Sequence, residues 1–316
     1  MSLYQILRYF CSLIFSGFAG CSQLPRAYPK VTGPVVVGHV ADATLNELSG
    51  IAPSRRESDM LWTHNDSGGA AEIYALNSTG ETLATIKVSN ATARDWEDIA
   101  TFVWHGEPWI LIADTGDNNA VRHDTKLYLL PEPTLHRGAT PTNLTLNAAF
   151  VLPFSWPEGP RDCEGVAVSP ETNEILLISK RTEPPVLYSL PLPDLTAPVT
   201  GATQVARLLN PVAGVVPPTA AERAIPGRLG QYRSQVSAFD LAPNGSAAAI
   251  LTYGNIWFYR RAPNESWATA LSHAPERIPV QGLPQAEALC FSADSQELWI
   301  TTEAERAPIQ HYRLKP

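Results

Sequence analysis

Acidic side chains recur at two positions of a repeated sequence pattern, and such side chains bind hard metal ions when they converge. Glutamates stand at the start of three repeats, and acidic residues stand at or just after the end of the second β-rich run in three repeats. Carboxylates that are brought together either take up protons or are neutralised by a cation. The sequence therefore predicts a metal site formed by Glu97, Glu164, Glu287, Asp66, Asp117 and Glu303.

Calcium is the cation that this pattern favours. Ca²⁺ accepts clustered carboxylate and amide oxygens, and it is the natural candidate in an exported protein. His64 is the only histidine near the predicted ligands, which argues against zinc because zinc sites use histidine or cysteine. The segment 114–119 (DTGDNN) resembles half of a calcium loop without the distal glutamate of an EF-hand. A tight turn rich in Asx residues is the alternative interpretation.

Three charged residues at or after the ends of second β-rich runs could take part in a hydrolytic reaction. Lys180 and Arg181 follow the second run of the third repeat and would hold the negative charge of a substrate. Asp114 would be the general base beside a water molecule activated by the metal. A structural alternative is that such acidic residues bind backbone amides of a neighbouring unit. Arg122 and His123 follow the segment 114–119, and we expect them to fold back over the site.

Five repeats must position these residues. Each repeat begins with two residues, often small or acidic, then an aliphatic residue and Ala or Cys, and a polar turn leads to a second β-rich run. The five starts are Ser49-Gly50-Ile51-Ala52, Glu97-Asp98-Ile99-Ala100, Glu164-Gly165-Val166-Ala167, Phe239-Asp240-Leu241-Ala242 and Glu287-Ala288-Leu289-Cys290. Each pair of runs predicts a β-hairpin, and a third strand usually follows. Intervals of about 50 to 75 residues between starts fit a four-stranded propeller blade.

The repeats predict an all-β propeller with five blades. The last repeat lacks a fourth strand, and residues 33–40 (GPVVVGHV) form a lone predicted strand, so we expect the N-terminal strand to close the ring. A sixth, degenerate blade within residues 210–235 is the alternative count, and a β-sandwich does not explain the repeats. The first strand of a propeller blade begins, and the second ends, on the same face. We therefore expect the charged residues to gather at one mouth of the axis.

The N-terminal segment predicts export and a lipid anchor. Arg8 precedes an apolar run over residues 9–19 that is too short to span a bilayer, and Phe18-Ala19-Gly20-Cys21 resembles a lipobox. We interpret residues 1–20 as a lipoprotein signal peptide, 21–32 as the lipidated Cys21 with a polar tether, and 33–316 as one propeller domain. An ordinary signal peptide with a chance cysteine is the alternative. The expected location is the periplasmic face of the cell envelope, with the outer membrane favoured over the inner.

Net charge, cysteine positions and the absence of common catalytic motifs limit the possible functions and bonds of the chain. The formal net charge is −8, and Lys and Arg are scattered without a basic stripe, which excludes nucleic acid as a partner. Cys163 and Cys290 fall on non-adjacent predicted blades, which favours two buried free thiols over a disulfide. The chain has no nucleophile elbow, Walker loop or HExxH motif, so serine hydrolase and P-loop functions lack support.

A resemblance to exported bacterial propellers of the SdiA-regulated and phytase-like esterase groups rests on three short motifs. They are Asp95-Trp96-Glu97-Asp98-Ile99-Ala100, Asp114-Thr115-Gly116-Asp117-Asn118 and Asp162-Cys163-Glu164-Gly165-Val166-Ala167. The resemblance covers most of residues 45–305 and implies a propeller with a polar, often calcium-dependent central site. It implies no particular reaction.

Three functions stay open on the sequence alone. The favoured one is a monomeric, membrane-tethered propeller that binds a small anionic ligand or an envelope protein at a mouth containing a cation. The second is a metal-dependent hydrolase of phosphoesters or lactones, and the third is a scaffold for envelope assembly. In each case we expect the lipid anchor to be the only contact with the membrane.

Overall fold

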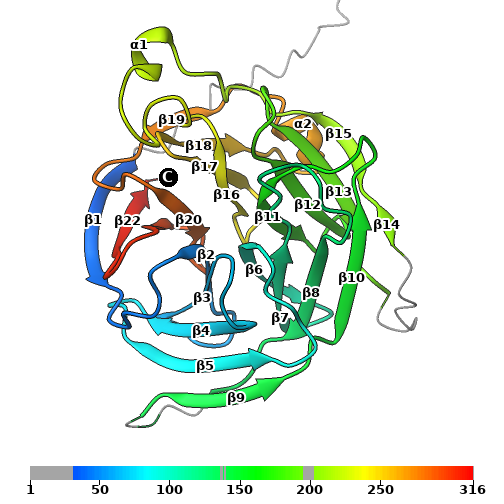
Figure 1. The fold of residues 1–316 in the computed structure, drawn as a ribbon, viewed down its shortest axis with the longest axis vertical. Coiled ribbons are helices and arrows are strands. Elements are labelled where there is room, and N and C mark those ends of the chain that lie inside the picture. Colours follow the sequence, from blue (N-terminus) through cyan, green and yellow to red (C-terminus); the bar gives the residue numbers. More distant parts are fainter. Residues whose placement is uncertain (1–30, 136–137, 139, 195–202, 316) are drawn as a thin grey trace, which may run out of the picture.

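Five small sheets stand in a ring around a central axis (Figure 1). The computed structural model describes residues 31–135, 138, 140–194 and 203–315. The innermost strands of neighbouring sheets contact one another all the way round, and the last contacts the first. The prediction of an all-β propeller with five blades is confirmed. The predicted signal peptide, Cys21 and the tether up to residue 30 lie outside the described residues.

The blades follow one another in chain order, each starting at the axis. Blade 1 comprises β2 (Leu48–Pro53), β3 (Met60–Asn65), β4 (Glu72–Asn77), β5 (Thr82–Val88) and an added parallel strand, β9 (Thr142–Leu146). Blade 2 comprises β6 (Trp96–Trp104), β7 (Glu107–Asp114), β8 (Lys126–Pro131), β10 (Phe150–Ser155) and the parallel β14 (Gln204–Val205). Blade 3 comprises β11 (Cys163–Ser169), β12 (Glu174–Ser179), β13 (Val186–Pro191) and β15 (Arg207–Pro211).

The last two blades have four strands each. Blade 4 comprises β16 (Val236–Leu241), β17 (Ala247–Thr252), β18 (Asn255–Arg260) and β19 (Glu276–Pro279). Blade 5 comprises β20 (Ala286–Phe291), β21 (Glu297–Thr302), β22 (Pro308–Leu314) and the N-terminal β1 (Val31–His39), which pairs antiparallel with β22. The connection 212–235 carries the short helix α1 (Ala220–Arg223) and adds no strand, so it holds no sixth blade. A second short helix, α2 (Trp267–Ala270), precedes β19.

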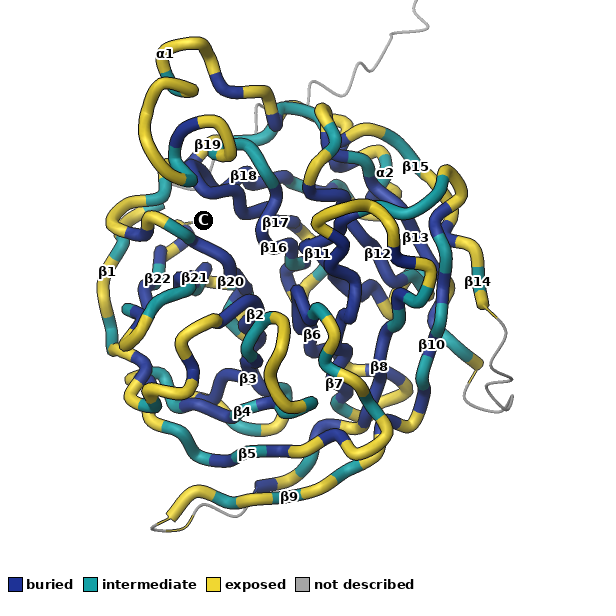
Figure 2. Tube along the Cα trace, in the orientation of Figure 1, coloured by how far each residue is buried: buried dark blue, intermediate teal, exposed yellow. Residues whose placement is uncertain are grey.

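Hydrophobic contacts between blades hold the ring together. Each of the five blade–blade interfaces contains one cluster of buried apolar side chains. The inner strands are buried on both faces because each lies between two neighbours, and all six residues of β2 are buried (Figure 2). The outer strands alternate instead, as in β10, where every second side chain is buried. The apolar core therefore lies between the blades.

Cys163 and Cys290 are both buried and free, which confirms the prediction of two thiols. Among the helices of the described ranges, none combines the length and the apolarity that crossing a bilayer requires.

Two aspartates of the inner strands, the buried Asp98 and the partly buried Asp240, join neighbouring blades. Asp98 in β6 accepts a hydrogen bond from the backbone N–H of Val166 in β11 at 2.8 Å. Asp240 in β16 accepts one from Phe291 in β20, also at 2.8 Å. Each carboxylate also accepts the N–H of the residue that follows it. The structural role that we considered for acidic residues therefore holds for these two.

The structure corrects the alignment of the fourth repeat. The sequence pattern places Asp240 at the position of Asp98. However, Asp98 pairs with Ala113, one residue before the end of β7, whereas Ala238 pairs with Leu251, one residue before the end of β17. Asp240 therefore lies two residues farther along its strand, away from the predicted mouth. The apolar residues around it repeat so regularly that the sequence alone did not reveal this shift.

The contribution of Asp240 to stability should fall as the pH rises from acid to neutral. Burial raises the pKa of Asp240 from 3.8 to about 6, so the folded protein keeps a proton that the unfolded chain releases. Across this window the free energy of unfolding should drop by about 3 kcal/mol, at about 1.4 kcal/mol per pKa unit. Asp240→Asn lacks this equilibrium. Urea titrations between pH 4 and pH 7 should therefore show the variant gaining most of that amount relative to wild type, and a constant difference would contradict the prediction.

Candidate metal centre

Every innermost strand carries a β-bulge near its first residue. The pairing register between the first and second strands shifts at one point in each blade, which leaves one residue without a partner. The five bulge residues are Ser49, Glu97, Glu164, Ser237 and Glu287. A bulge changes the direction of its side chain. The three glutamates come close enough for their charges to interact. Besides burial, the charge of Glu287 contributes to the raised pKa of Glu164, and the charge of Glu164 to that of Glu97.

The residues directly after the second strands lie at the same end of the blades. These residues are Asp66, Thr115, Lys180, Tyr253 and Glu303. Together with the five bulge residues they form what we call the mouth. It contains three glutamates from bulges, two more acidic residues and one lysine, so acidic groups outnumber basic ones five to one.

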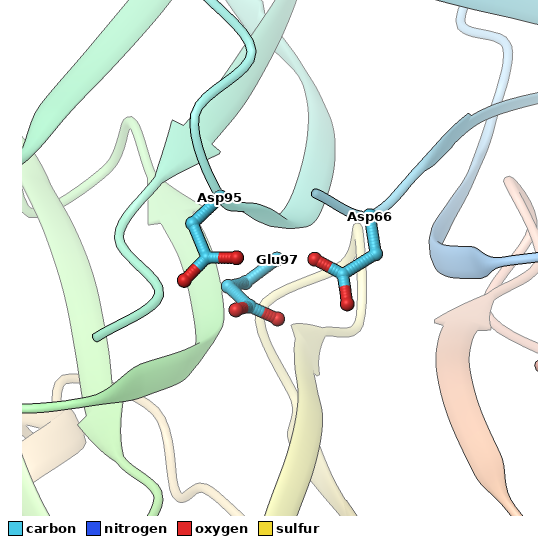
Figure 3. Close-up of side chains that lie close together, drawn as sticks. All are labelled: Asp66, Asp95 and Glu97. Atoms are coloured by element: carbon cyan, nitrogen blue, oxygen red, sulfur yellow. The ribbon is translucent and has the colours of Figure 1, made fainter. Parts of the chain in front are cut away.

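Two groups of three carboxylates lie close together at the mouth, each including one aspartate from just before a bulge. Oxygens of Asp66, Asp95 and Glu97 lie within 4.8 Å of one another (Figure 3), and so do oxygens of Glu97, Asp162 and Glu164. Blades 1, 2 and 3 all contribute, and Glu97 belongs to both groups. We call these five residues the carboxylate cluster. Oxygen ligands of this kind are the donor set that hard divalent cations take.

Burial makes the negative charge of the cluster costly. Glu97 and Glu164 are each 2% exposed. Burial, followed by the charge of Glu164, raises the pKa of Glu97 well above its ordinary value. Burial also raises the pKa of Glu164, against the effect of Lys180. Burial and then Asp95 raise the pKa of Asp66 to about 7. Without a cation the raised pKa values favour the protonated forms of Glu97 and Asp66, and a cation that binds these two must displace their protons.

Lys180 neutralises only part of the cluster. Its Nζ donates to Oε1 of Glu164, and both side chains are buried. The other oxygen of Glu164, Oε2, is also buried and has no hydrogen-bond partner among the described residues. A buried polar atom without a partner costs stability. Three carboxylates that come together in a buried place, one of them with an unpartnered oxygen, fit a bound metal ion.

Gly116 leaves the space that the cluster occupies. A Cβ built on Gly116 would overlap Oε1 of Glu97 and would lie 2.5 Å from Oδ2 of Asp95. Any other residue at this position would therefore displace both carboxylates. Sequence reasoning singled out the segment 114–119 for its aspartates, but the residue that packs directly against the cluster is its glycine.

The aspartates of the segment 114–119 form hydrogen bonds within their own loop. Asp114 accepts from Nη2 of Arg122 at 2.7 Å in a buried ion pair. Asp117 accepts the backbone N–H groups of Val121 and Arg122 at 2.9 and 2.8 Å. Arg122 also donates to the carbonyl of Gly116, so it folds back as expected. The segment therefore matches the tight turn given as the alternative, and neither aspartate belongs to a carboxylate group of the cluster.

The two glutamates of blade 5 lie at the mouth but outside both carboxylate groups. The hydroxyl of Tyr253 donates to Glu287 at 2.8 Å, and Nη1 of Arg228 donates to the same hydroxyl at 3.0 Å. Burial and then Glu287 raise the pKa of Glu303. Arg228 comes from the connection 212–235, so this long excursion brings a cation to the mouth.

Asp95 and Asp162 complete the two carboxylate groups, although sequence reasoning did not include them among the ligands. Each lies two residues before a bulge glutamate, and residues two apart in an extended segment face the same side. That spacing was the available signal. Asp162 also lies 2.7 Å from Nε of Arg181, which in turn contacts Asn118. Arg181 therefore forms a cationic edge beside the cluster.

Comparisons with known proteins do not assign the chain to a family. No family model matches it, and no curated protein matches its sequence. A gluconolactonase from Xanthomonas campestris is 12% identical with a TM-score of 0.45, over 91% of this chain and 95% of its own. The hydrazine synthase of Kuenenia stuttgartiensis is 9% identical with a TM-score of 0.42, over 83% and 82% of the two chains. A chain of a mitotic checkpoint complex is 11% identical with a TM-score of 0.38, over 85% and 64%. Function must therefore be argued from the site.

Proposed function

We propose that this protein is a lipid-anchored propeller of the cell envelope that holds a divalent cation in its carboxylate cluster and binds a small anionic ligand there. The observation that carries the proposal is the second carboxylate group. Glu97, Asp162 and Glu164 bring oxygens within 4.8 Å of one another in a buried setting. Lys180 contacts only one oxygen of Glu164, and the other has no partner in the described part of the chain.

Calcium is the proposed cation because every donor in the cluster is a carboxylate oxygen. Ca²⁺ accepts six to eight oxygen ligands in flexible geometry, and water completes sites that the protein fills only in part. No histidine or cysteine belongs to either carboxylate group of the described residues, so the set does not suit zinc.

An anionic ligand is proposed because cations surround the place where the metal would bind. A bound Ca²⁺ has coordination positions beyond the protein oxygens. Lys180 is buried beside the cluster, Arg181 borders Asp162, and Arg228 reaches Tyr253. A carboxylate or phosphate that coordinates the cation would also meet these groups. An envelope protein presenting such a group is the other proposed partner. Anchoring through Cys21, a monomeric state, and membership of the SdiA-regulated or phytase-like groups belong to the same proposal.

The test is a melting experiment on the purified protein after removal of metals with EDTA. Ca²⁺ at about 100 times its dissociation constant should add about 2.7 kcal/mol of stability, which raises Tm by about 5 °C for a domain of this size. Mg²⁺ and Zn²⁺ are the comparison ions. The proposal fails if no divalent cation raises Tm.

A panel of lactones and phosphoesters, assayed with and without Ca²⁺, separates binding from catalysis. The binding proposal expects no turnover. Turnover that requires the metal would replace it with the hydrolase alternative, in which Lys180 and Arg181 hold the substrate. In that case Asp114 would need to leave its ion pair with Arg122 to act as a base.

A further inference from the structure

A cavity of about 310 Å³ lies on the face of the ring opposite the mouth. It is lined by the C-terminal ends of β6, β11 and β16 and by the turns that follow β11 and β16, whereas the mouth lies at the N-terminal ends of the inner strands. We call it the distal cavity. Its size falls within the range of pockets that enclose small molecules.

Arg55 lines the distal cavity, and its guanidinium is not paired with any carboxylate that the structure describes. Its Nε and Nη2 both donate to the carbonyl oxygen of Thr101, at 3.1 and 2.8 Å. Among the described residues, the guanidinium forms no ion pair, and Nη1 has no hydrogen-bond partner. A partly buried guanidinium that contacts only one carbonyl is incompletely satisfied, because it carries five N–H donors.

Two carboxylates, Glu132 and Asp240, exert their charge on Arg55, but both accept hydrogen bonds from other groups. Glu132 accepts from the Ser54 hydroxyl, from Nε1 of Trp62 at 2.8 Å, and from the backbone N–H of Arg55 at 2.9 Å. Asp240 accepts two backbone N–H groups, as described above. Neither accepts from the guanidinium. Asp240 also lines the cavity, and its charge acts on Arg55. The unused N–H donors of the guanidinium, Nη1 above all, are nevertheless open to an anion that enters the cavity.

The remaining wall of the distal cavity is largely apolar. Phe102, Val103, Val168 and Trp267 line it, and Val103 is 50% exposed at its edge. Glu171 also lines it, but this carboxylate lies 3.2 Å from Nη1 of Arg261. A guanidinium binds a carboxylate with two parallel hydrogen bonds, and an apolar wall binds an apolar chain. One guanidinium beside such a wall therefore suits a molecule with a short apolar body and one carboxylate.

We propose that the distal cavity binds a small apolar monocarboxylate through Arg55. The site is separate from the carboxylate cluster and needs no metal. Its existence does not depend on the function proposed for the mouth.

Calorimetry with hexanoate tests this site, with hexan-1-ol as the neutral probe of similar size. Wild type should bind hexanoate at least ten times more tightly than hexan-1-ol, and EDTA should leave the affinity unchanged. Arg55→Met keeps an apolar stem and should weaken hexanoate binding at least tenfold.

A second variant keeps the test valid if Arg55→Met does not fold. Val103→Glu adds a repelling charge at the edge of the cavity and should weaken hexanoate binding about tenfold, whereas Val205→Glu, on the exposed outer strand β14, should not. The proposal is overturned if wild type does not bind hexanoate, or if either cavity variant binds it as tightly as wild type. An affinity that falls in EDTA would place the ligand at the mouth and would also overturn it.

Discussion

Glu97→Gln should weaken Ca²⁺ binding about 100-fold, equivalent to about 2.7 kcal/mol at 1.4 kcal/mol per tenfold change. Glu97 is the only residue that belongs to both carboxylate groups, so its loss removes a ligand from either arrangement of the cation. The replacement is nearly isosteric. Because burial already disfavours the charged form of Glu97, the metal-free variant should fold at least as stably as wild type. Calorimetric titration of EDTA-treated protein with Ca²⁺ measures the effect.

Glu287→Gln is the matched control for Glu97→Gln. Glu287 occupies the same bulge position in blade 5, and the sequence predicts it as a metal ligand on the same grounds. It lies outside both carboxylate groups and accepts from Tyr253 instead. We expect its replacement to change Ca²⁺ affinity less than threefold. Equal losses in the two variants would show that the cation is not held where the two groups meet.

Lys180→Met should destabilise the metal-free protein by roughly 3–5 kcal/mol, because it leaves Glu164 buried without its charged partner. Both side chains of the pair are at most 4% exposed. In saturating Ca²⁺ the loss should be smaller, since a cation can then neutralise Glu164. Urea unfolding in EDTA and in Ca²⁺ gives the two free energies of unfolding to compare.

Lys87→Met, on the exposed side of β5, is the control for Lys180→Met. Its effect should stay within about 0.5 kcal/mol in both conditions, as for most surface substitutions. If Lys180→Met loses the same stability with and without Ca²⁺, the cation does not reach Glu164, and the second carboxylate group is not part of the metal site.

The architecture was predictable from the sequence because the apolar repeat determines it. Each repeat start forms a strand buried on both faces, and the turns between runs are short and polar. The repeat of blade 4 shows the limit of this reasoning. Its apolar residues allow an alignment shifted by two positions, and only the strand pairing places Ser237, rather than an acidic residue, at the bulge.

The site was only partly predictable, because the sequence shows which residues are charged but not which of them neutralise one another. Asp114 and Asp66 look equivalent in the sequence, since each stands near the end of a second strand. Arg122 neutralises Asp114, whereas no described cation pairs with Asp66. Gly116 leaves space for the cluster because the turn after β7 packs against the start of β6 in the same blade. The spacing of residues in the sequence does not reveal this packing.

Anomalous diffraction from crystals grown in Ca²⁺ tests the central claim most directly. We predict a calcium peak in the mouth, in contact with a carboxylate oxygen of Glu97 and with oxygens from at least one neighbouring blade. A mouth with no such peak, or a calcium ion that Glu97 does not touch, would contradict the account.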